Sequence, residues 1–141
     1  FASCGVALVF LPHIGGSFLH GATFYDKDKI IIGMTVRGKD ADRFWFSLFH
    51  EVAHIVYGHI SQRQGTYNED ELQADKFAEE ILIPSNSFNE FARAGDFSQA
   101  AIIKFARAQE IDAGIVVGRL QNKGYIRNNT HNNLKKKYEI R

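Results

Sequence analysis

The stretch Phe44-Trp-Phe-Ser-Leu-Phe-His-Glu-Val-Ala-His-Ile-Val-Tyr57 decides the fold of this chain. Its apolar residues recur at helical spacing and surround nearly every side of the helix, which is typical of a helix buried in a core. Three polar residues, His50, Glu51 and His54, interrupt this apolar pattern. Burying such groups costs free energy unless a partner satisfies them. The stretch therefore predicts a buried helix, Phe44–Tyr57, that carries a polar site.

The spacing of the two histidines indicates metal binding. His50 and His54 are four residues apart, so both imidazoles lie on one helix face and can reach a single ion. Glu51, beside the first histidine, can polarise a water bound to that ion. This His-Glu-x-x-His spacing is the zincin pattern. The alternative interpretation is a pair of hydrogen-bonded core histidines beside a salt-bridged glutamate.

A second predicted helix, Glu69–Ile83, supplies the third ligand that a catalytic zinc site requires. Glu71 shares a helix face with the apolar Ala74, so we expect its carboxylate to point along the buried side. Asp75, one turn later, is placed to accept a hydrogen bond from the second ring nitrogen of a ligand histidine. The alternative is that Asn68 caps the helix and that Glu71 completes a capping box.

The remaining elements predict an α+β fold, with a small antiparallel sheet packed on a helical zincin-like core. A hairpin turn at 26–28 joins the predicted strands Gly21–Tyr25 and Lys29–Thr35. We expect the second of these strands to be the edge along which a substrate peptide pairs, with an ordinary core strand as the alternative. Helical spacing continues through Ser85–Arg93, Ser98–Gln109 and Ala113–Asn122.

Composition limits the class of protein and its compartment. The chain has 141 residues, 45% of them apolar, and one cysteine. These values predict one domain with a real core and exclude general disorder. One cysteine excludes a disulfide framework within the chain, and no apolar run approaches the roughly 18 residues of a membrane span. No signal peptide is visible, so we expect a cytoplasmic protein that has no membrane partner.

Charge separates a body from a tail. From Arg119 onward, seven Lys or Arg residues accompany one acid, whereas the preceding residues hold ten Lys or Arg and fifteen acids. We divide the chain into a metallopeptidase-like domain, 1–127, and a basic tail, 128–141. The domain comprises strands within 5–36, active-site helices within 44–83 and C-terminal helices within 85–122. The lysines at 135–137 are expected to be solvated, with attraction to an acidic partner or phosphate backbone as the alternative.

Three segments together resemble the ImmA/IrrE metallopeptidases: Arg43-Phe44, His-Glu-Val-Ala-His, and Glu71-Leu-Gln-Ala-Asp-Lys-Phe-Ala ending at Pro84. Arg43 lies two residues further from His50 than in the family pattern, and Ala53 stands where the family usually has glycine. The resemblance covers about residues 5–125. It implies Zn²⁺ as the cofactor, His50, His54 and Glu71 as its ligands, and Glu51 as the general base.

The first functional hypothesis is a zinc-dependent endopeptidase whose protein substrate, by family resemblance, is a helix-turn-helix transcriptional repressor. The alternative is a non-catalytic regulatory or antitoxin module that binds protein or DNA together with an N-terminal helix-turn-helix domain preceding Phe1. A third hypothesis is direct DNA contact through 105–120, whose sequence pattern is similar to that of a helix-turn-helix. We favour a packed helical hairpin there, because only Arg119, Gln121 and Asn122 could read bases.

Two further sets of residues stay open at this stage. The developing oxyanion needs a donor, and the candidates that the sequence does not rank are Tyr25, Arg43, Tyr57, His59 and Tyr67. The histidines outside the motif, His13, His20, His59 and His131, have no ligand spacing. His59, directly after Gly58, is interpreted as a cation at the helix end.

Overall fold

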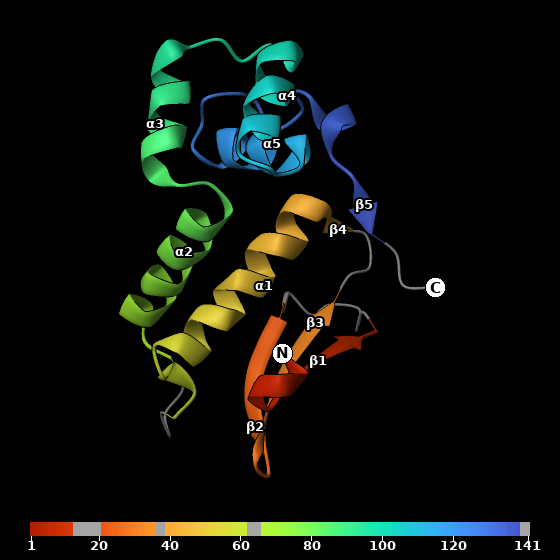
Figure 1. Ribbon diagram of the computed structural model, residues 1–141, viewed down its shortest axis with the longest axis vertical. Coiled ribbons are helices and arrows are strands. Elements are labelled where there is room, and N and C mark those ends of the chain that lie inside the picture. Colours follow the sequence, from red (N-terminus) through yellow and green to blue (C-terminus); the bar gives the residue numbers. More distant parts are fainter. Residues whose placement is uncertain (13–20, 36–38, 62–65, 139–141) are drawn as a thin grey trace.

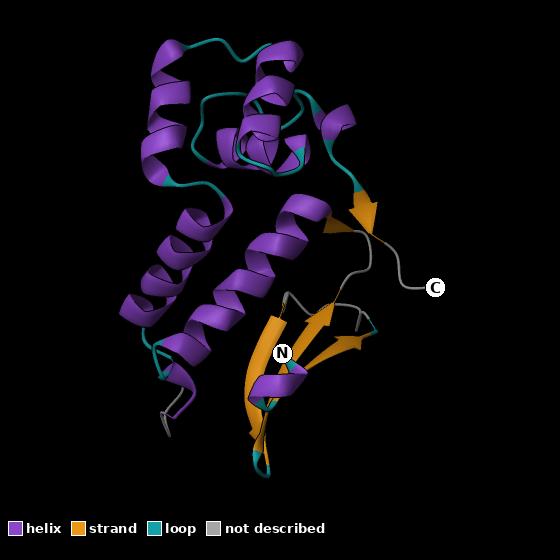
Figure 2. Ribbon diagram, in the orientation of Figure 1, coloured by secondary structure: helices purple, strands orange, loops and turns teal. Residues whose placement is uncertain are grey.

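The computed structural model describes residues 1–12, 21–35, 39–61 and 66–138, which form a small sheet and a larger helical part (Figure 1, Figure 2). After a 3-10 turn, Ala2–Cys4, come three strands: β1 (Val6–Leu11), β2 (Gly21–Asp26) and β3 (Lys29–Thr35). Five α-helices follow in the described residues: α1 (Ala41–Val56), α2 (Asn68–Leu82), α3 (Ser85–Ala94), α4 (Gln99–Ala108) and α5 (Ala113–Asn122). The α+β prediction is confirmed.

The three-stranded sheet is mixed rather than antiparallel. β2 and β3 form the predicted antiparallel hairpin, whose two-residue loop contains Lys27 at a left-handed φ of 57°. β1, however, pairs parallel with the opposite side of β3, so the strand order is β1-β3-β2. The expectation that Lys29–Thr35 is an edge strand is therefore wrong. Apolar content identifies a strand, but the direction and side of its partners depend on the connection, which lies in 13–20, outside the described residues.

The helix α1 packs its apolar side against the sheet. Phe44 and Leu48 are buried together with Ile32 and Met34 of β3 and with Val6 of β1. α2 lies alongside α1 on its other side (Figure 1). α1 is therefore held between the sheet and α2.

A second core joins the C-terminal helices, and it decides the interpretation of 105–120. α5 is nearly wholly buried, with Val116, Val117 and Leu120 fully inside. The Arg119 side chain is 10% exposed and donates to the backbone carbonyls of Glu79 and Ile83 at the end of α2. The Arg119 side chain is thus held within the fold, and α4 and α5 pack against each other as a helical hairpin. Among the described residues, no helix has the length and apolar character needed to cross a bilayer.

The C-terminal segment packs back onto the start of α1 instead of extending into solvent. Its strand β5 (Lys137–Tyr138) pairs antiparallel with β4 (Lys39–Asp40), after a 3-10 turn at Asn132–Leu134. The Lys135 side chain is 7% exposed, and its Nζ lies 3.0 Å from Asp42 Oδ2. The expectation of a wholly solvated lysine run is therefore wrong for this residue. Its ionic partner lies 93 positions earlier, which a local charge pattern does not show.

Candidate metal and catalytic site

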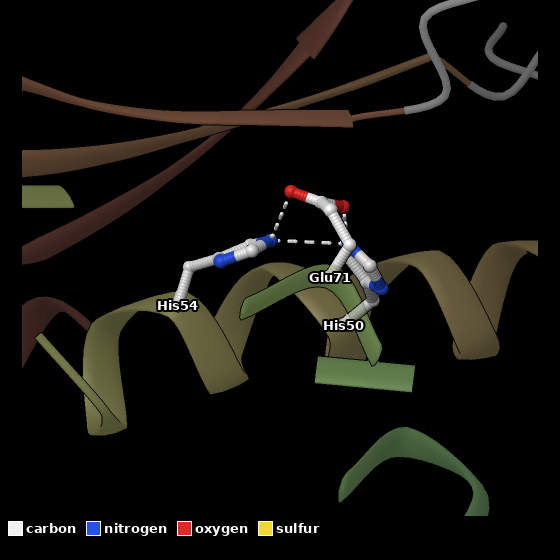
Figure 3. Close-up of side chains that lie close together, drawn as sticks. All are labelled: His50, His54 and Glu71. Carbon is white, nitrogen blue, oxygen red and sulfur yellow. Dashed lines mark hydrogen bonds and ion pairs between the residues drawn. The ribbon is translucent and has the colours of Figure 1, made fainter. Parts of the chain in front are cut away.

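The two histidines of the motif meet on one face of α1. The Nε2 atoms of His50 and His54 lie 3.0 Å apart, with the ring planes nearly perpendicular (Figure 3). His54 is buried and His50 is partly buried. Helical spacing brings the rings together, and apolar packing of α1 on the sheet keeps them out of bulk water.

Glu71 reaches from α2 to both rings. Its Oε2 lies 3.1 Å from His50 Nε2, and its Oε1 lies 3.5 Å from His54 Nε2 (Figure 3). One donor atom from each of the three residues can be chosen so that all lie within 4.8 Å of one another. The structure thus brings together the three residues that the sequence grouped as ligands, although they come from two helices.

The start of α2 explains why Glu71 is free to face α1. The N-cap residue is Tyr67, and its backbone N–H donates to Asp70 Oδ2 at 2.9 Å. Asp70 therefore has the capping role, and the alternative of a capping box between Asn68 and Glu71 is wrong. Glu71 instead accepts a hydrogen bond of 2.5 Å from the Thr66 hydroxyl, which orients its carboxylate.

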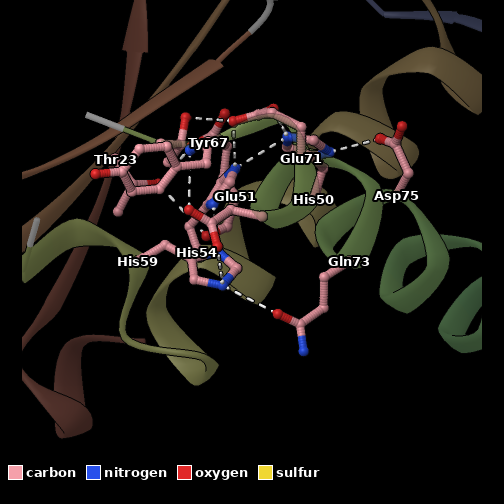
Figure 4. A network of polar contacts seen from close by, with 11 residues as sticks. Thr23, His50, Glu51, His54, His59, Tyr67, Glu71, Gln73 and Asp75 are labelled. Carbon is pink, nitrogen blue, oxygen red and sulfur yellow. Dashed lines mark hydrogen bonds and ion pairs between the residues drawn. The ribbon is translucent and has the colours of Figure 1, made fainter. Parts of the chain in front are cut away.

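Asp75 lies on the far side of His50. Its Oδ1 is 2.8 Å from His50 Nδ1 (Figure 4). An ionised carboxylate only accepts hydrogen bonds, so Nδ1 of this ring donates to Asp75. With its proton on Nδ1, a neutral His50 would bind a metal through Nε2.

Glu51 is held at the sheet rather than against the histidines. It is 9% exposed, and the Thr23 hydroxyl on β2 donates to its Oε2 at 2.6 Å (Figure 4). Gly21, on the same strand, leaves room for it, since a Cβ there would come within 2.9 Å of Glu51 Cγ. Thr23 carries no sequence signal for this contact, because only the packing of β2 on α1 brings the two residues together.

His59 belongs to the same polar network, although its sequence spacing gave no such indication. The residue is 5% exposed, and its Nδ1 lies 2.9 Å from His54 Nδ1. Its Nε2 lies 3.1 Å from Gln73 Oε1 and 3.4 Å from Asp70 Oδ1. It is therefore a buried member of the polar network around His54. The available signal was Gly58, whose φ of 72° turns the chain back toward α1.

The charge states in this network suit metal binding. Burial lowers the pKa of His54, and the nearby His50 imidazole lowers it further against the opposing carboxylates of Glu71 and Glu51. Burial by itself would raise the pKa of Glu71, but the Thr66 hydroxyl and the two imidazoles together bring it below its usual range. His54 is therefore neutral and Glu71 ionised near neutral pH, which are the forms that ligate metals.

A pocket of about 410 Å³ lies beside these side chains and is bordered by β2. Its lining residues on that strand run from Gly21 to Tyr25, and the opposite wall includes His50, Glu51, His54 and Glu71. β2 has a strand partner on one side only among the described strands. The edge strand next to the candidate site is thus β2, not β3.

The candidate oxyanion donors differ in their position relative to this pocket. Tyr25 and His59 line the pocket, whereas Arg43 lines a different one, of about 480 Å³, between α1 and α5. Tyr57 stacks on the His59 ring at 5.7 Å, and Tyr67 lies near the network (Figure 4).

The other histidines outside the motif do not join this network within the described residues. His131 Nε2 contacts the carbonyl of Phe97 in the C-terminal part. His13 and His20 lie outside the described residues.

The donor set fits a zinc ion. Two imidazole nitrogens and one carboxylate oxygen are the ligands of many hydrolytic zinc sites, and they leave a coordination position for water. The tautomer of His50 and the ionised Glu71 both satisfy this requirement. Mn²⁺ and Fe²⁺ accept the same donors, so the ligand set fits a class of divalent cations and does not single out zinc.

Comparison with protein families agrees with this geometry. Residues 20–120 match the peptidase family M78, described as the IrrE N-terminal-like domain. The match covers more than half of the chain and includes every candidate site residue. The chain belongs to the M78 peptidase family. The resemblance to ImmA/IrrE metallopeptidases is thereby confirmed, and in the comparison with curated proteins none matches.

Membership in the M78 family indicates a metallopeptidase-type function with a protein or peptide substrate. The matched segment begins one residue before β2 and ends within α5, so β1 and the C-terminal segment lie outside it. The matched elements are therefore sufficient to supply all the residues of the candidate site.

Proposed function

We propose that this chain is a zinc-dependent endopeptidase with His50, His54 and Glu71 as metal ligands and Glu51 as general base. The observation that carries the proposal is the convergence of two imidazole nitrogens and a carboxylate from separate helices, with all three donor atoms within 4.8 Å. A buried glutamate stands next to the first of these ligands in sequence, and the group faces a pocket.

The protein side chains have distinct roles in this proposal. A zinc ion in this site would supply Lewis acidity, which acidifies a water molecule and polarises a peptide carbonyl. Glu51 accepts the proton of the attacking water and delivers it to the leaving amine. Thr23 holds the Glu51 carboxylate through its hydroxyl, while Asp75 holds His50 in the required tautomer.

The edge strand β2 is the proposed binding surface for the substrate backbone. A peptide added to its open edge would form main-chain hydrogen bonds beside the pocket. Thr23 lies on this strand and contacts Glu51, so a peptide bond aligned there would stand close to the general base. Among the pocket-lining donors, Tyr25 is our candidate for contact with the developing oxyanion.

A helix-turn-helix transcriptional repressor is the proposed substrate, and the cytoplasm is the proposed compartment. The first proposal rests on the resemblance to ImmA/IrrE proteins. The second rests on the single cysteine, which is typical of proteins in a reducing compartment. Neither affects the chemistry of the site.

The test is the substitution Glu51→Gln, compared with Glu90→Gln on the exposed face of α3. We expect Glu51→Gln to lower the rate of cleavage of a candidate repressor by about 10²–10⁴-fold while zinc binding is retained. The Glu90 variant should cleave at the wild-type rate. A wild-type protein that binds zinc and cleaves neither a repressor nor an unfolded protein would contradict the proposal and favour the non-catalytic regulatory module.

A further inference from the structure

We infer that His59 is a positioning residue that fixes the tautomer of His54, so that His54 presents its Nε2 lone pair to the metal. The metal-binding part of this inference rests on the proposed function. The hydrogen-bond chain itself is a property of the protein without the ion. His59 follows α1 in the 3-10 turn His59–Ser61 and was not among the residues that the motif identifies.

The contact between the two rings joins their Nδ1 atoms. These atoms lie 2.9 Å apart, and both side chains are at least nine-tenths buried. A hydrogen bond between two imidazole nitrogens requires that one carries a proton and the other a lone pair. The direction of this bond therefore decides which nitrogen of His54 is free to bind a cation.

The partners of His59 on its other side set that direction. Its Nε2 lies 3.1 Å from Gln73 Oε1 and 3.4 Å from Asp70 Oδ1. A glutamine amide can reverse its donor and acceptor ends, but an ionised carboxylate only accepts hydrogen bonds. Gln73 Oε1 is the hydrogen-bond partner of His59 Nε2, and the nearby negative carboxylate of Asp70 favours the proton at this same nitrogen. Asp70 is itself oriented by the backbone N–H of Tyr67 at the start of α2.

The remaining step follows from the chemistry of a neutral imidazole, which has one N–H and one lone pair. With its proton on Nε2, His59 accepts through Nδ1 the hydrogen bond that His54 Nδ1–H donates. His54 Nε2 is then the nitrogen that presents a lone pair when a cation binds between His50, His54 and Glu71. The chain Asp70–His59–His54 thus does for the second histidine what Asp75 does for His50.

Asp75 and His59, the hydrogen-bond partners of His50 and His54, differ in exposure. This difference predicts which substitution weakens zinc binding more. The Asp75 side chain is 47% exposed, so water can replace it, whereas the His59 side chain is 5% exposed. Removing His59 leaves the buried His54 N–H without an acceptor. We therefore expect His59 to be more sensitive to substitution than Asp75.

A pair of variants tests the inference. In His59→Asn the amide oxygen stands near the place of Nδ1 and can accept the His54 proton, whereas His59→Leu fills the space without an acceptor. In a competition with a chromogenic chelator, we expect His59→Leu to bind zinc about 10–100-fold more weakly than wild type. His59→Asn should stay within about three-fold of wild type. Equal losses in both variants, or no loss in either, would overturn the inference.

Long-range ¹H–¹⁵N NMR of the imidazole rings gives a second readout that does not depend on activity. We expect Nε2 of His59 to carry a proton in the metal-free protein, and His54 to carry its proton on Nδ1 after zinc addition. A proton on His59 Nδ1 would overturn the inference even if the leucine variant does not fold. The His59 signal is measured without metal. A chain that binds no zinc would therefore contradict the proposed function, while the position of the His59 proton would still be measured.

Discussion

His54 and Arg119 are both buried, yet they lie in regions that use polar groups differently. Arg119 joins α5 to the end of α2, where two backbone carbonyls accept its Nη1 protons and the Phe88 ring lies 4.3 Å beneath the guanidinium. Its partners all belong to the chain. His54 instead directs Nε2 toward His50 Nε2 and the Glu71 carboxylate, which are also electron donors.

This difference separates a structural polar group from a functional one. The Arg119 guanidinium, whose Nη1 donates to two backbone carbonyls, holds two helices together within the fold. His50, His54 and Glu71 converge from two helices, and in the proposed function a cation binds between their donor atoms. The C-terminal helices are accordingly expected to govern stability, and the region around α1, α2 and β2 is expected to govern metal binding and catalysis.

The same substitution in each region gives the largest expected contrast. His54→Ala removes one of the three proposed ligands, so we expect zinc affinity to fall by at least about 100-fold, measured by isothermal titration calorimetry. His131→Ala removes a contact with the Phe97 carbonyl, and zinc affinity should stay at the wild-type value. Similar losses of zinc from both variants would remove the distinction between the regions.

Arg119→Met tests the structural region by itself. The change leaves the carbonyls of Glu79 and Ile83 without their donor, so we expect the free energy of unfolding to fall by roughly 3 kcal/mol in urea denaturation. Zinc affinity of the folded protein should be unchanged. Reduced zinc affinity at wild-type stability would show that α5 contributes to the site.

The pH dependence of stability is a smaller effect, confined to the site region. Because the folded-state pKa of His54 is lowered, the unfolded chain binds a proton that the folded chain does not once pH falls below about 6.5. Metal-free protein in a chelator should therefore lose stability as pH falls from about 7 to 5. The loss should be smaller in His54→Ala and unchanged in His131→Ala. An equal loss in all three proteins would show that His54 contributes nothing to it.

Much of the site could be predicted because its signals are local. Histidines four residues apart in an apolar stretch identify α1 and its face, and the apolar stripe beside Glu71 gives the direction of α2. Thr23 could not be predicted, because its contact with Glu51 requires β2 to pack on α1. His59 was misjudged because Gly58 turns it back toward the preceding helix, which sequence spacing does not express.

The positions of the helices could also be predicted from the sequence, but the direction of the strands could not. Apolar periodicity located the helices, and Ala113–Asn122 has the bounds that the sequence predicted. Strand direction was not encoded locally, so the parallel pairing of β1 with β3 was missed. The docking of the C-terminal segment was missed for the same reason, because Lys135 and Asp42 lie 93 positions apart in the sequence and no local pattern links them.

The most direct measurement is an anomalous-scattering map at the zinc edge from crystals of the zinc-loaded chain. The account predicts one strong peak within bonding distance, about 2.0–2.2 Å, of His50 Nε2, His54 Nε2 and a Glu71 oxygen. A peak held by other residues, or no peak between these three after loading, would contradict it.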